Sequence, residues 1–387
     1  MLTSAYIAHN KLKAALLAAA FALTLFLPLA LSFLIREYQS DLTARADTTP
    51  LVLGARGDRY DLVLKSLYFS GGLETSLSAA DLDTLTQQHA SRAIHIPLHL
   101  GYSARRYPLV GTSLDYFPFR NLTVADGSLP LRLGDAVLGH TVARELGLGP
   151  GSHLITDQSS LFNIASTYPL KLRITGILAP SGSPDDRAVF ADIKTAWVVA
   201  GIGHGHADLA SPEAGSQILE QTDTNVTGSK AVFEYAEITP KNLASFHFHA
   251  DRPGLPVSSI LVAPHTPRDA TLLKAKLSLD ESRQLLAPSG VVAELLGLVF
   301  RIKAFLDRAA WLVYALTATF TTLVVILSLR LRRDERRTLH RIGCSRFTVA
   351  RLQANELLIL LALGATIALA VAYLLVTLFP NPLQSLT

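Results

Sequence analysis

The sequence predicts a membrane protein: an α-helical bundle of three spans with a large α+β extracytoplasmic domain. Three observations predict this class. Uncharged segments of about 20 residues occur at three places, excess positive charge lies beside them, and a long segment of ordinary polarity separates the first from the second. Only 17% of all residues are charged, against roughly 25% in an average soluble protein, and the deficit is confined to the uncharged segments.

Each uncharged segment is long enough to cross a membrane as a helix. Residues 14–35 and 309–329 contain no charged side chain, and none occurs from residue 357 onward. A helix rises about 1.5 Å per residue, so about 20 apolar residues cross a hydrocarbon core about 30 Å thick. A cleaved signal peptide is the alternative for residues 14–35. This segment is longer than the apolar part of such a peptide and lacks a small-x-small cleavage site, which favours an uncleaved anchor.

The distribution of charge predicts the orientation of the spans. Residues 36–308 carry 25 basic and 28 acidic side chains, so the positive excess lies in two short segments that flank the spans. These are residues 1–13, with Lys11 and Lys13, and residues 330–356, with eight arginines. Positively charged flanks stay in the cytoplasm. We therefore expect a multi-pass protein whose N-terminus is cytoplasmic and whose large domain is extracytoplasmic.

Local patterns predict both helices and strands in the outer domain. Ser78 and Asp81 form a capping-box pattern that begins a helix, and residues 142–146 are predicted to form a short helix that ends at Gly147. Apolar and polar residues alternate over 170–175, which predicts a half-buried strand. Further strands are predicted at residues 188–190 and 257–262.

Three other segments have distinct predicted roles. Residues 37–50 are polar and are predicted to be a linker. Residues 205–245 are poor in large apolar side chains and are predicted to be a mobile surface excursion. From residue 289 the pattern turns helical without an intervening proline, which predicts one long helix up to about residue 342. The single cysteine, Cys344, lies in the inner loop, so the outer domain is expected to depend on its core and not on disulfides.

The loop between the second and third spans has a helix–turn–helix pattern. Gly343 suits the position after a helix and Ser345 suits an N-cap, so a long helix is expected to stop and restart within three residues. From Arg332 the loop reads RRDERRTLHRIGCSR. It resembles the R-x-x-E-…-L-…-I-G-[small]-S-[basic] loop of the FtsX/MacB-like family of ABC transporter permeases.

That resemblance implies that the loop docks on a separate ABC ATP-binding subunit. The alternative is that its arginines only anchor the topology. The residues implied in docking are Arg333, Glu335, Leu339, Ile342, Gly343, Ser345, Arg346, Phe347 and Glu356.

Three stretches of the outer domain resemble the same family. Residues 135–151, DAVLGHTVARELGLGPG, look like the G-x-x-[LV]-A-x-x-L-G-L-x-x-G segment of its MacB-like periplasmic core domain. Residues 172–184 are similar to its V-x-G-[IV]-L-x-x-[ST]-G-[ST]-x-x-D stretch, and residues 51–65 look like the segment after the first span in one branch. The resemblance implies a permease subunit of the bacterial inner membrane, paired with a second copy or a related permease.

The expected domains follow from the spans. Residues 1–36 are expected to form an interfacial helix and the first span, and residues 37–300 the MacB-like core domain. Residues 301–387 would supply the stalk helix, two spans and the coupling loop 330–356. Members of the family normally have four spans, whereas Thr387 follows the third span here by nine residues. Three spans are therefore expected, either because this branch uses three or because the sequence is shortened.

No nucleotide-binding or catalytic motif occurs in the sequence. A phosphate-binding G-x-x-x-x-G-K-[ST] loop and a G-x-S-x-G elbow are both absent. We expect no enzymatic activity and no cofactor in this chain, with ATP bound by the partner subunit. No run of base-stacking aromatic residues accompanies the arginines, so nucleic acid is not an expected partner.

Ten of the twelve histidines lie in the outer domain, where four of them form two His-x-His pairs. On a strand, residues i and i+2 point to the same side, so each pair can offer two imidazoles to Zn²⁺ or Cu²⁺. Asp208 and Asp251 are candidate additional ligands. The alternative is solvated histidines of loops and strands, because no fixed-spacing metal motif surrounds them. The two pairs are His204 with His206 and His247 with His249.

Three functional hypotheses follow. The leading one is a permease of the mechanotransmission type, which couples ATP hydrolysis by a partner to a change in the outer domain and so exports or extracts an envelope substrate. The second is a membrane-tethered scaffold or binding protein that works without ATP. The third is a metal-handling envelope protein that uses its His-x-His pairs.

Overall fold

A computed structural model describes residues 11–72, 75–158, 169–206, 218–222, 225–228, 235–277, 280–331, 341 and 343–378. These residues form two compact units. The helical unit comprises the described residues of Met1–Asp41 and Glu294–Pro382, and the outer unit those of Leu42–Ala293. Two long helices, α2 (Lys11–Asp47) and α9 (Pro288–Leu331), each contribute residues to both units.

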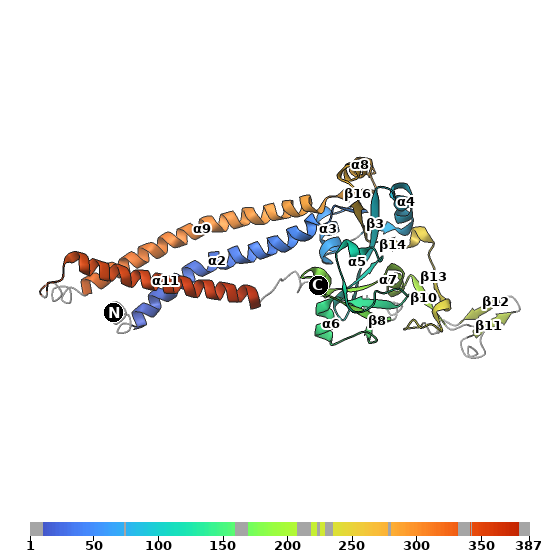
Figure 1. The fold of residues 1–387 in the computed structure, drawn as a ribbon, viewed down its shortest axis with the longest axis horizontal. Coiled ribbons are helices and arrows are strands. Elements are labelled where there is room, and N and C mark those ends of the chain that lie inside the picture. The colour runs from blue at the N-terminus through green and yellow to red at the C-terminus, as the bar shows by residue number, and fades with distance from the viewer. Residues whose placement is uncertain are drawn as a thin grey trace. The chain divides into compact units, whose positions relative to one another are not determined.

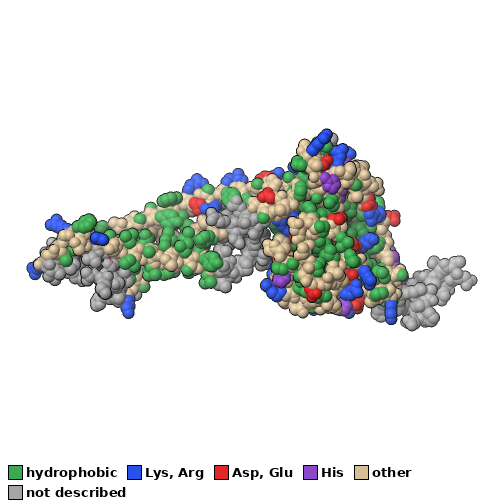
Figure 2. All heavy atoms as spheres, in the orientation of Figure 1, with side chains coloured by type: hydrophobic (Ala, Val, Ile, Leu, Met, Phe, Trp, Pro, Cys, Tyr) green, Lys and Arg blue, Asp and Glu red, His purple; other side chains and the backbone are tan. Residues whose placement is uncertain are grey.

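The helical unit consists of α2, α9 and α11 (Arg346–Leu378). Two of its segments are long and apolar enough to cross a membrane, Ala14–Phe33 in α2 and Arg346–Leu375 in α11. The expected middle span, residues 309–329, is helical as part of α9 but is not one of these two segments, so the count of three spans stays a prediction. Figure 2 shows hydrophobic side chains spread along the visible face of this unit.

Small residues let the helices of this unit approach closely. A Cβ atom at Gly364 of α11 would lie 2.7 Å from the Cβ of Phe21 and 2.9 Å from the carbonyl oxygen of Ala18, both in α2. The hydroxyl oxygens of Thr24 in α2 and Thr317 in α9 lie 3.1 Å apart. Close backbone contact at glycine and hydrogen bonds between helices are typical of helix association in membranes. Helix α2 therefore contacts both α9 and α11.

The outer unit is built on a mixed ten-stranded sheet with the order β16-β1-β15-β3-β4-β9-β6-β8-β5, to which β7 adds beside β8 (Figure 1). The pairs β4–β9 and β6–β8 are parallel, and the other neighbours are antiparallel. This is an α+β domain, as the sequence predicts. The strands of this sheet are β1 (Leu51–Ala55), β3 (Ala93–Ala104), β4 (Tyr107–Thr112), β5 (Val124–Gly127), β6 (Asp135–Leu138), β7 (His153–Ile155), β8 (Lys171–Leu178), β9 (Val189–Asp192), β15 (Ser259–Pro264) and β16 (Arg283–Leu286).

Three smaller two-stranded sheets and several helices complete the outer unit. The small sheets pair β10 (Gly203–Gly205) with β13 (Phe246–Phe248), β11 (Ile218–Thr222) with β12 (Asn225–Gly228), and β14 (Pro256–Val257) with β2 (Leu77–Ser78). The α-helices are α3 (Arg59–Tyr68), α4 (Ala79–His89), α5 (Tyr116–Phe119), α6 (His140–Leu146), α7 (Ile193–Val199) and α8 (Pro267–Leu277). Short 3-10 helices are η1 (Pro184–Arg187), η3 (Leu243–Ser245) and η4 (Arg252–Gly254).

Several local predictions are confirmed. Ser78 caps α4 with a full capping box, in which its hydroxyl accepts from the Asp81 amide and the Asp81 carboxylate accepts from the Ser78 amide. Helix α6 ends at Gly147, which has a φ of 64°. Burial alternates along β8, with Leu172 and Ile174 buried between more exposed neighbours, because successive side chains of a strand point to opposite faces.

The predicted linker at residues 37–50 is wrong. Helix α2 continues to Asp47 and ends before Pro50. The segment from residue 36 to 47 contains no glycine or proline, and its alanines, leucine and arginines favour helix. Proline disfavours helical backbone in the residue before it, so the helix ends near this point. The first helix is therefore continuous from its apolar segment into the outer unit.

The predicted excursion at residues 205–245 is only partly described. Strands β11 and β12 form a two-stranded sheet within it, and Glu237 forms an ion pair with Lys171 at 2.8 Å. Residues 207–217, 223–224 and 229–234 lie outside the described residues.

Among the residues that the structure describes, two hydrophobic core clusters support the sheet. One packs α6 against the centre of the sheet and includes the fully buried Val142, Leu172 and Val189. The other surrounds β1 and β15 and includes Leu53 and Ile260.

Candidate functional site

The turn between α9 and α11 has the predicted local geometry. Gly343 has a φ of 92°, a conformation that side-chain-bearing residues rarely adopt. The Ser345 hydroxyl accepts a hydrogen bond from the Thr348 amide at 3.1 Å, and α11 begins at Arg346. Phe347 is 77% exposed, which leaves an apolar side chain at the start of α11 available to a partner.

The other predicted coupling residues are only partly placed. Arg346 is exposed, and Glu356, ten residues further along α11, is half-buried. Arg333, Glu335, Leu339 and Ile342 lie outside the described residues.

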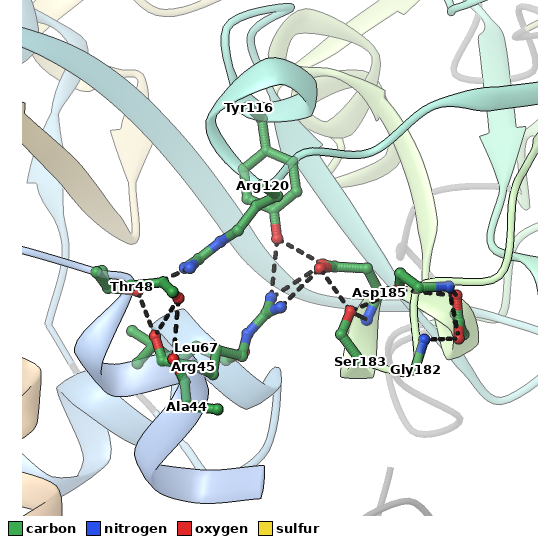
Figure 3. A network of polar contacts seen from close by, with 12 residues as sticks. Ala44, Arg45, Thr48, Leu67, Tyr116, Arg120, Gly182, Ser183 and Asp185 are labelled. Atoms are coloured by element: carbon green, nitrogen blue, oxygen red, sulfur yellow. Dashed lines mark hydrogen bonds and ion pairs between the residues drawn. The ribbon is translucent and has the colours of Figure 1, made fainter.

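The C-terminal end of α2 is held by a buried polar network, which we call the Arg45 clamp: Arg45, Tyr116 and Asp185 (Figure 3). Two guanidinium nitrogens of Arg45 donate to the two carboxylate oxygens of Asp185 at 2.6 and 2.9 Å. Arg45 also donates to the Tyr116 hydroxyl at 3.0 Å and, through Nε, to the carbonyl of Leu67. The Tyr116 hydroxyl in turn donates to Asp185 at 2.6 Å.

The clamp is fully withdrawn from solvent. Arg45 is 7% exposed, Asp185 1% and Tyr116 0%. Burial opposes the charge of both ionic partners, but each stabilises the charge of the other, so the pKa of Arg45 lies above and that of Asp185 below its ordinary value. Burial and the Asp185 carboxylate raise the pKa of Tyr116, which keeps its hydroxyl protonated as a donor. Removal of one partner of such a pair leaves an uncompensated buried charge.

A second arginine extends the network to the residues after α2. The Arg45 carbonyl accepts from the Thr49 hydroxyl at 2.8 Å, and the same hydroxyl oxygen accepts from Arg120 at 2.7 Å. The Arg120 guanidinium also lies over the rings of Phe119 and Tyr116, at 4.9 and 5.9 Å from their centroids. The end of α2 is thus fastened to α5 as well as to the Asp185 turn.

Two of the three family-like segments, residues 135–151 and 172–184, lead to the turn that carries Asp185. A Cβ atom at Gly139 would lie 2.3 Å from the carbonyl oxygen of Asp185, so only glycine allows this approach. The Gly139 amide donates to the Ala188 carbonyl at 2.9 Å. Asp186 closes the preceding turn by accepting from the amides of Ser181 and Gly182 at 2.9 and 2.8 Å. Gly139 in one segment and Ser181 and Gly182 in the other therefore hold the turn that carries Asp185.

Sequence reasoning did not find the clamp. Asp185 lies just after the family-like stretch 172–184, and Arg45 lies in the segment predicted to be a linker. The two residues are 140 positions apart, and no local pattern joins them. The available signal was a single arginine in an otherwise helix-favouring segment just before Pro50.

The two predicted histidine pairs come together in one cluster, which we call the histidine ribbon: His204, His206, His247 and His249. His204 and His247 are direct partners of the antiparallel β10–β13 pair. Nε2 of His249 lies 3.3 Å from Nε2 of His204, and one nitrogen from each of His204, His206 and His247 lies within 4.8 Å of the others. His247 and His249 are exposed and the other two are half-buried.

Of the two predicted carboxylate ligands, Asp251 does not join this cluster. Asp208 lies outside the described residues, and the group within ligand distance contains only histidines among the residues that the structure places. His95 and His99 lie on β3, away from these four histidines in the sequence.

Comparison with known proteins connects this architecture to a family. The family model described as MacB-like periplasmic core domain matches residues 33–232. The fold is similar to the periplasmic region of MacB from Actinobacillus actinomycetemcomitans, at 12% identity and a TM-score of 0.37, over 66% of this chain and 97% of that one. It is also similar to the extracellular domain of the noncanonic ABC-type transporter YknZ from Gram-positive bacteria, at 12% identity and a TM-score of 0.33, over 61% and 98%. No curated protein matches the sequence significantly.

Proposed function

Because the chain belongs to the FtsX/MacB-like family, we propose that it is the transmembrane subunit of an ABC transporter of the mechanotransmission type. A separate ATPase subunit would bind and hydrolyse ATP in the cytoplasm. The permease would convert the closure of that subunit into a conformational change of its outer unit, and so export or extract an envelope substrate. The match of the core-domain model over residues 33–232 is the observation that carries this proposal.

The continuity of α2 and α9 supports a mechanical route. Both helices run without interruption between the helical unit and the outer unit. A helix transmits displacement along its axis when its end is fixed. The Arg45 clamp fixes the end of α2 with a bidentate ion pair, which has a more defined geometry than a single contact.

The turn at Gly343 supports a cytoplasmic docking element. Eight arginines occur between residues 330 and 356, which favours a cytoplasmic position for this loop. In this orientation the N-terminus is cytoplasmic, α2 and α11 cross the inner membrane, and residues 309–329 of α9 supply the third span. Exposed Phe347 and the glycine-dependent turn would then face the ATPase.

The exposed apolar side chains of α9 and α11 support contact with lipid and with a second permease subunit. Trp311, Leu312 and Leu316 are 70%, 64% and 61% exposed, and Tyr373 of α11 is 69% exposed. Such surfaces are not stable in water. Two copies of the chain, or one copy with a related permease, would bury part of them.

The test is to reconstitute the full chain in lipid nanodiscs with the ABC ATPase encoded beside it and to measure binding and ATP hydrolysis. We expect the chain to bind the ATPase and to change its rate of hydrolysis. Gly343→Val and Glu335→Ala should each abolish that change, because the first strains the turn and the second removes a charge of the docking loop. Arg252→Ala, which breaks an exposed ion pair with Asp83, is the matched control and should retain coupling.

Failure to bind the ATPase, or an unaltered rate of hydrolysis, would overturn the proposal. The competing hypothesis is a membrane-tethered scaffold that works without ATP. Under that hypothesis, Gly343→Val and Glu335→Ala leave the scaffold function intact.

A further inference from the structure

We propose that the histidine ribbon is a binding site for a divalent transition-metal ion, with Zn²⁺ as the best-fitting ion. The imidazoles of His204, His206 and His247 form the group within ligand distance, and His249, whose Nε2 lies 3.3 Å from that of His204, would complete a tetrahedron after a side-chain rotation. This site is independent of the ATPase-docking loop.

The backbone of the ribbon places all four imidazoles on one face. Residues two apart on a strand point to the same side, and directly opposite residues of antiparallel strands share a face. His204 is paired with His247, so His206 and His249 extend the same face in opposite directions along the two strands. Neighbouring rings lie with centroids 4.6 to 5.8 Å apart.

The other face of the ribbon packs against the hydrophobic core. Phe248 and Phe246 lie over Gly203 and Gly205, where an added Cβ atom would come within 2.5 Å of either ring. Phe248 also packs edge-on against Trp197, with the ring centroids 6.0 Å apart. Because the phenylalanines fix which way the ribbon faces, the histidines are gathered before any ligand arrives. A site arranged in advance binds its ligand more tightly than one that must be ordered.

The nitrogen distances suit a small tetrahedral ion. A Zn–N bond is about 2.0–2.1 Å, so two nitrogens on a tetrahedral zinc lie about 3.3 Å apart. The Nε2 atoms of His249 and His204 are 3.3 Å apart. The ligand nitrogens of His204, His206 and His247 lie within 4.8 Å of one another, and small side-chain rotations would bring them to the same spacing.

One of the histidines already makes the second hydrogen bond that orients metal-bound histidines. Nδ1 of His247 lies 2.9 Å from the carbonyl oxygen of Ser245. When this nitrogen donates its hydrogen, Nε2 carries the lone pair that can bind a metal ion. A second hydrogen bond of this kind sets the tautomer and ring orientation of most metal-binding histidines.

The donor set decides the class of metal. Neutral imidazoles suit Zn²⁺, Cu²⁺ and Ni²⁺, whereas Ca²⁺ and Mg²⁺ need oxygen ligands. No carboxylate or thiolate joins the group among the described residues. Neutral ligands leave the charge of the ion uncompensated, so we expect an ion that exchanges with the medium. Bound metal would link β10 to β13 and so close the base of the 40 residues between His206 and His247.

The experiment titrates the purified full-length protein, stripped of metal by chelation, with Zn²⁺ in competition with a chromophoric chelator. We expect one Zn²⁺ per chain and a higher midpoint of thermal unfolding when Zn²⁺ is bound. The double variant His247→Asn/His249→Asn should bind Zn²⁺ at least about 100-fold more weakly, because loss of even an outer-shell partner costs about 10–100-fold. His265→Asn removes an exposed histidine elsewhere on the outer unit and is the matched control.

Co²⁺ supplies a readout of geometry. Bound at the ribbon, it should show the intense visible absorption of tetrahedral cobalt, which the double variant should lose. Both replaced side chains are exposed, so the metal-free variant should unfold at the same temperature as the wild type. If the metal-free double variant unfolds at a different temperature, the single variant His249→Asn is compared with the wild type instead. Equal Zn²⁺ affinity in wild type and variant, equal weakening by His265→Asn, or a weak octahedral cobalt spectrum would each overturn the proposal.

Discussion

The Arg45 clamp and the histidine ribbon are both clusters of polar side chains on the outer unit, but they differ in where their hydrogen-bonding capacity is directed. In the clamp, the donors of Arg45 meet the acceptors of Asp185 inside the protein. In the ribbon, two of the four imidazoles are exposed and the cluster points away from the phenylalanine face. A buried and internally satisfied cluster holds parts of the chain together, whereas an exposed cluster of like groups is suited to an external ligand.

Breaking the clamp should have the largest effect on stability. Asp185→Ala leaves the guanidinium of Arg45 buried without its counter-charge, so we expect a loss of about 3–5 kcal/mol in the free energy of unfolding. Chemical or thermal unfolding of the full chain in detergent, followed by near-UV circular dichroism, measures this. The double variant Arg45→Met/Asp185→Leu should recover much of the loss, because a packed apolar pair can replace a buried ion pair. A loss below 1 kcal/mol in Asp185→Ala would show that the clamp is solvated.

A buried histidine outside both clusters should make stability depend on pH. His99 is 5% exposed, and burial lowers its pKa from 6.5 to about 4. Between pH 6.5 and 4 the unfolded chain binds a proton at this residue and the folded chain does not, so stability falls as the pH falls through this window. The contribution is at most about 3 kcal/mol.

The variant His99→Leu isolates this contribution. Other histidines also titrate, so the measured quantity is the difference between wild type and variant in unfolding free energy at pH 7 and at pH 4.5. The wild type should lose more. Identical losses would mean that His99 is protonated in the folded state.

Arg45→Lys should weaken the clamp without removing its charge. Lysine cannot make the bidentate contact to Asp185 while also reaching Tyr116 and the Leu67 carbonyl. We expect a loss of about 1.5–3 kcal/mol, the range for hydrogen bonds to charged groups. The same unfolding assay applies, and a loss equal to that of Asp185→Ala would show that charge without geometry contributes nothing.

The ribbon should be nearly neutral to stability in the absence of metal. Exposed side chains away from caps and cores change stability by about 0.5 kcal/mol or less, so we expect this of His247→Asn/His249→Asn. Unfolding is measured after chelation. A loss of 2 kcal/mol or more in the free energy of unfolding would show that the ribbon, like the clamp, stabilises the fold. The contrast between the two clusters would then not hold.

The sequence predicts features that depend on neighbours along the chain. The uncharged segments, the capping box at Ser78, the end of α6 at Gly147 and the turn from Gly343 to Ser345 all rest on residues within a few positions of one another. Helix formation and capping are local effects, so the structure has helices at the three uncharged segments and the predicted caps and turn, while the count of three membrane spans stays a prediction. The α+β class and the family follow from the same local motifs taken in order.

Features that depend on contacts between residues far apart in the sequence were predicted only in part or not at all. The His-x-His pairs were identified, but their meeting depends on the register of β10 against β13, which joins residues 45 positions apart. Arg45 was assigned to a linker because its polar neighbours resemble one, while the partner that explains its burial is 140 positions away. The two phenylalanines and two glycines that orient the ribbon have meaning only once the strands are paired.

The continuity of α2 has a consequence for how this protein can change over evolution. A helix turns by about 100° and advances by about 1.5 Å with each residue. An insertion of one residue between the apolar segment and Arg45 would therefore rotate the guanidinium away from Asp185, whereas an insertion of seven would restore its angular phase within about 20°. Length changes between residues 34 and 44 should therefore be tolerated best in near-whole turns, because only these keep the angular phase of Arg45 relative to the apolar segment along α2.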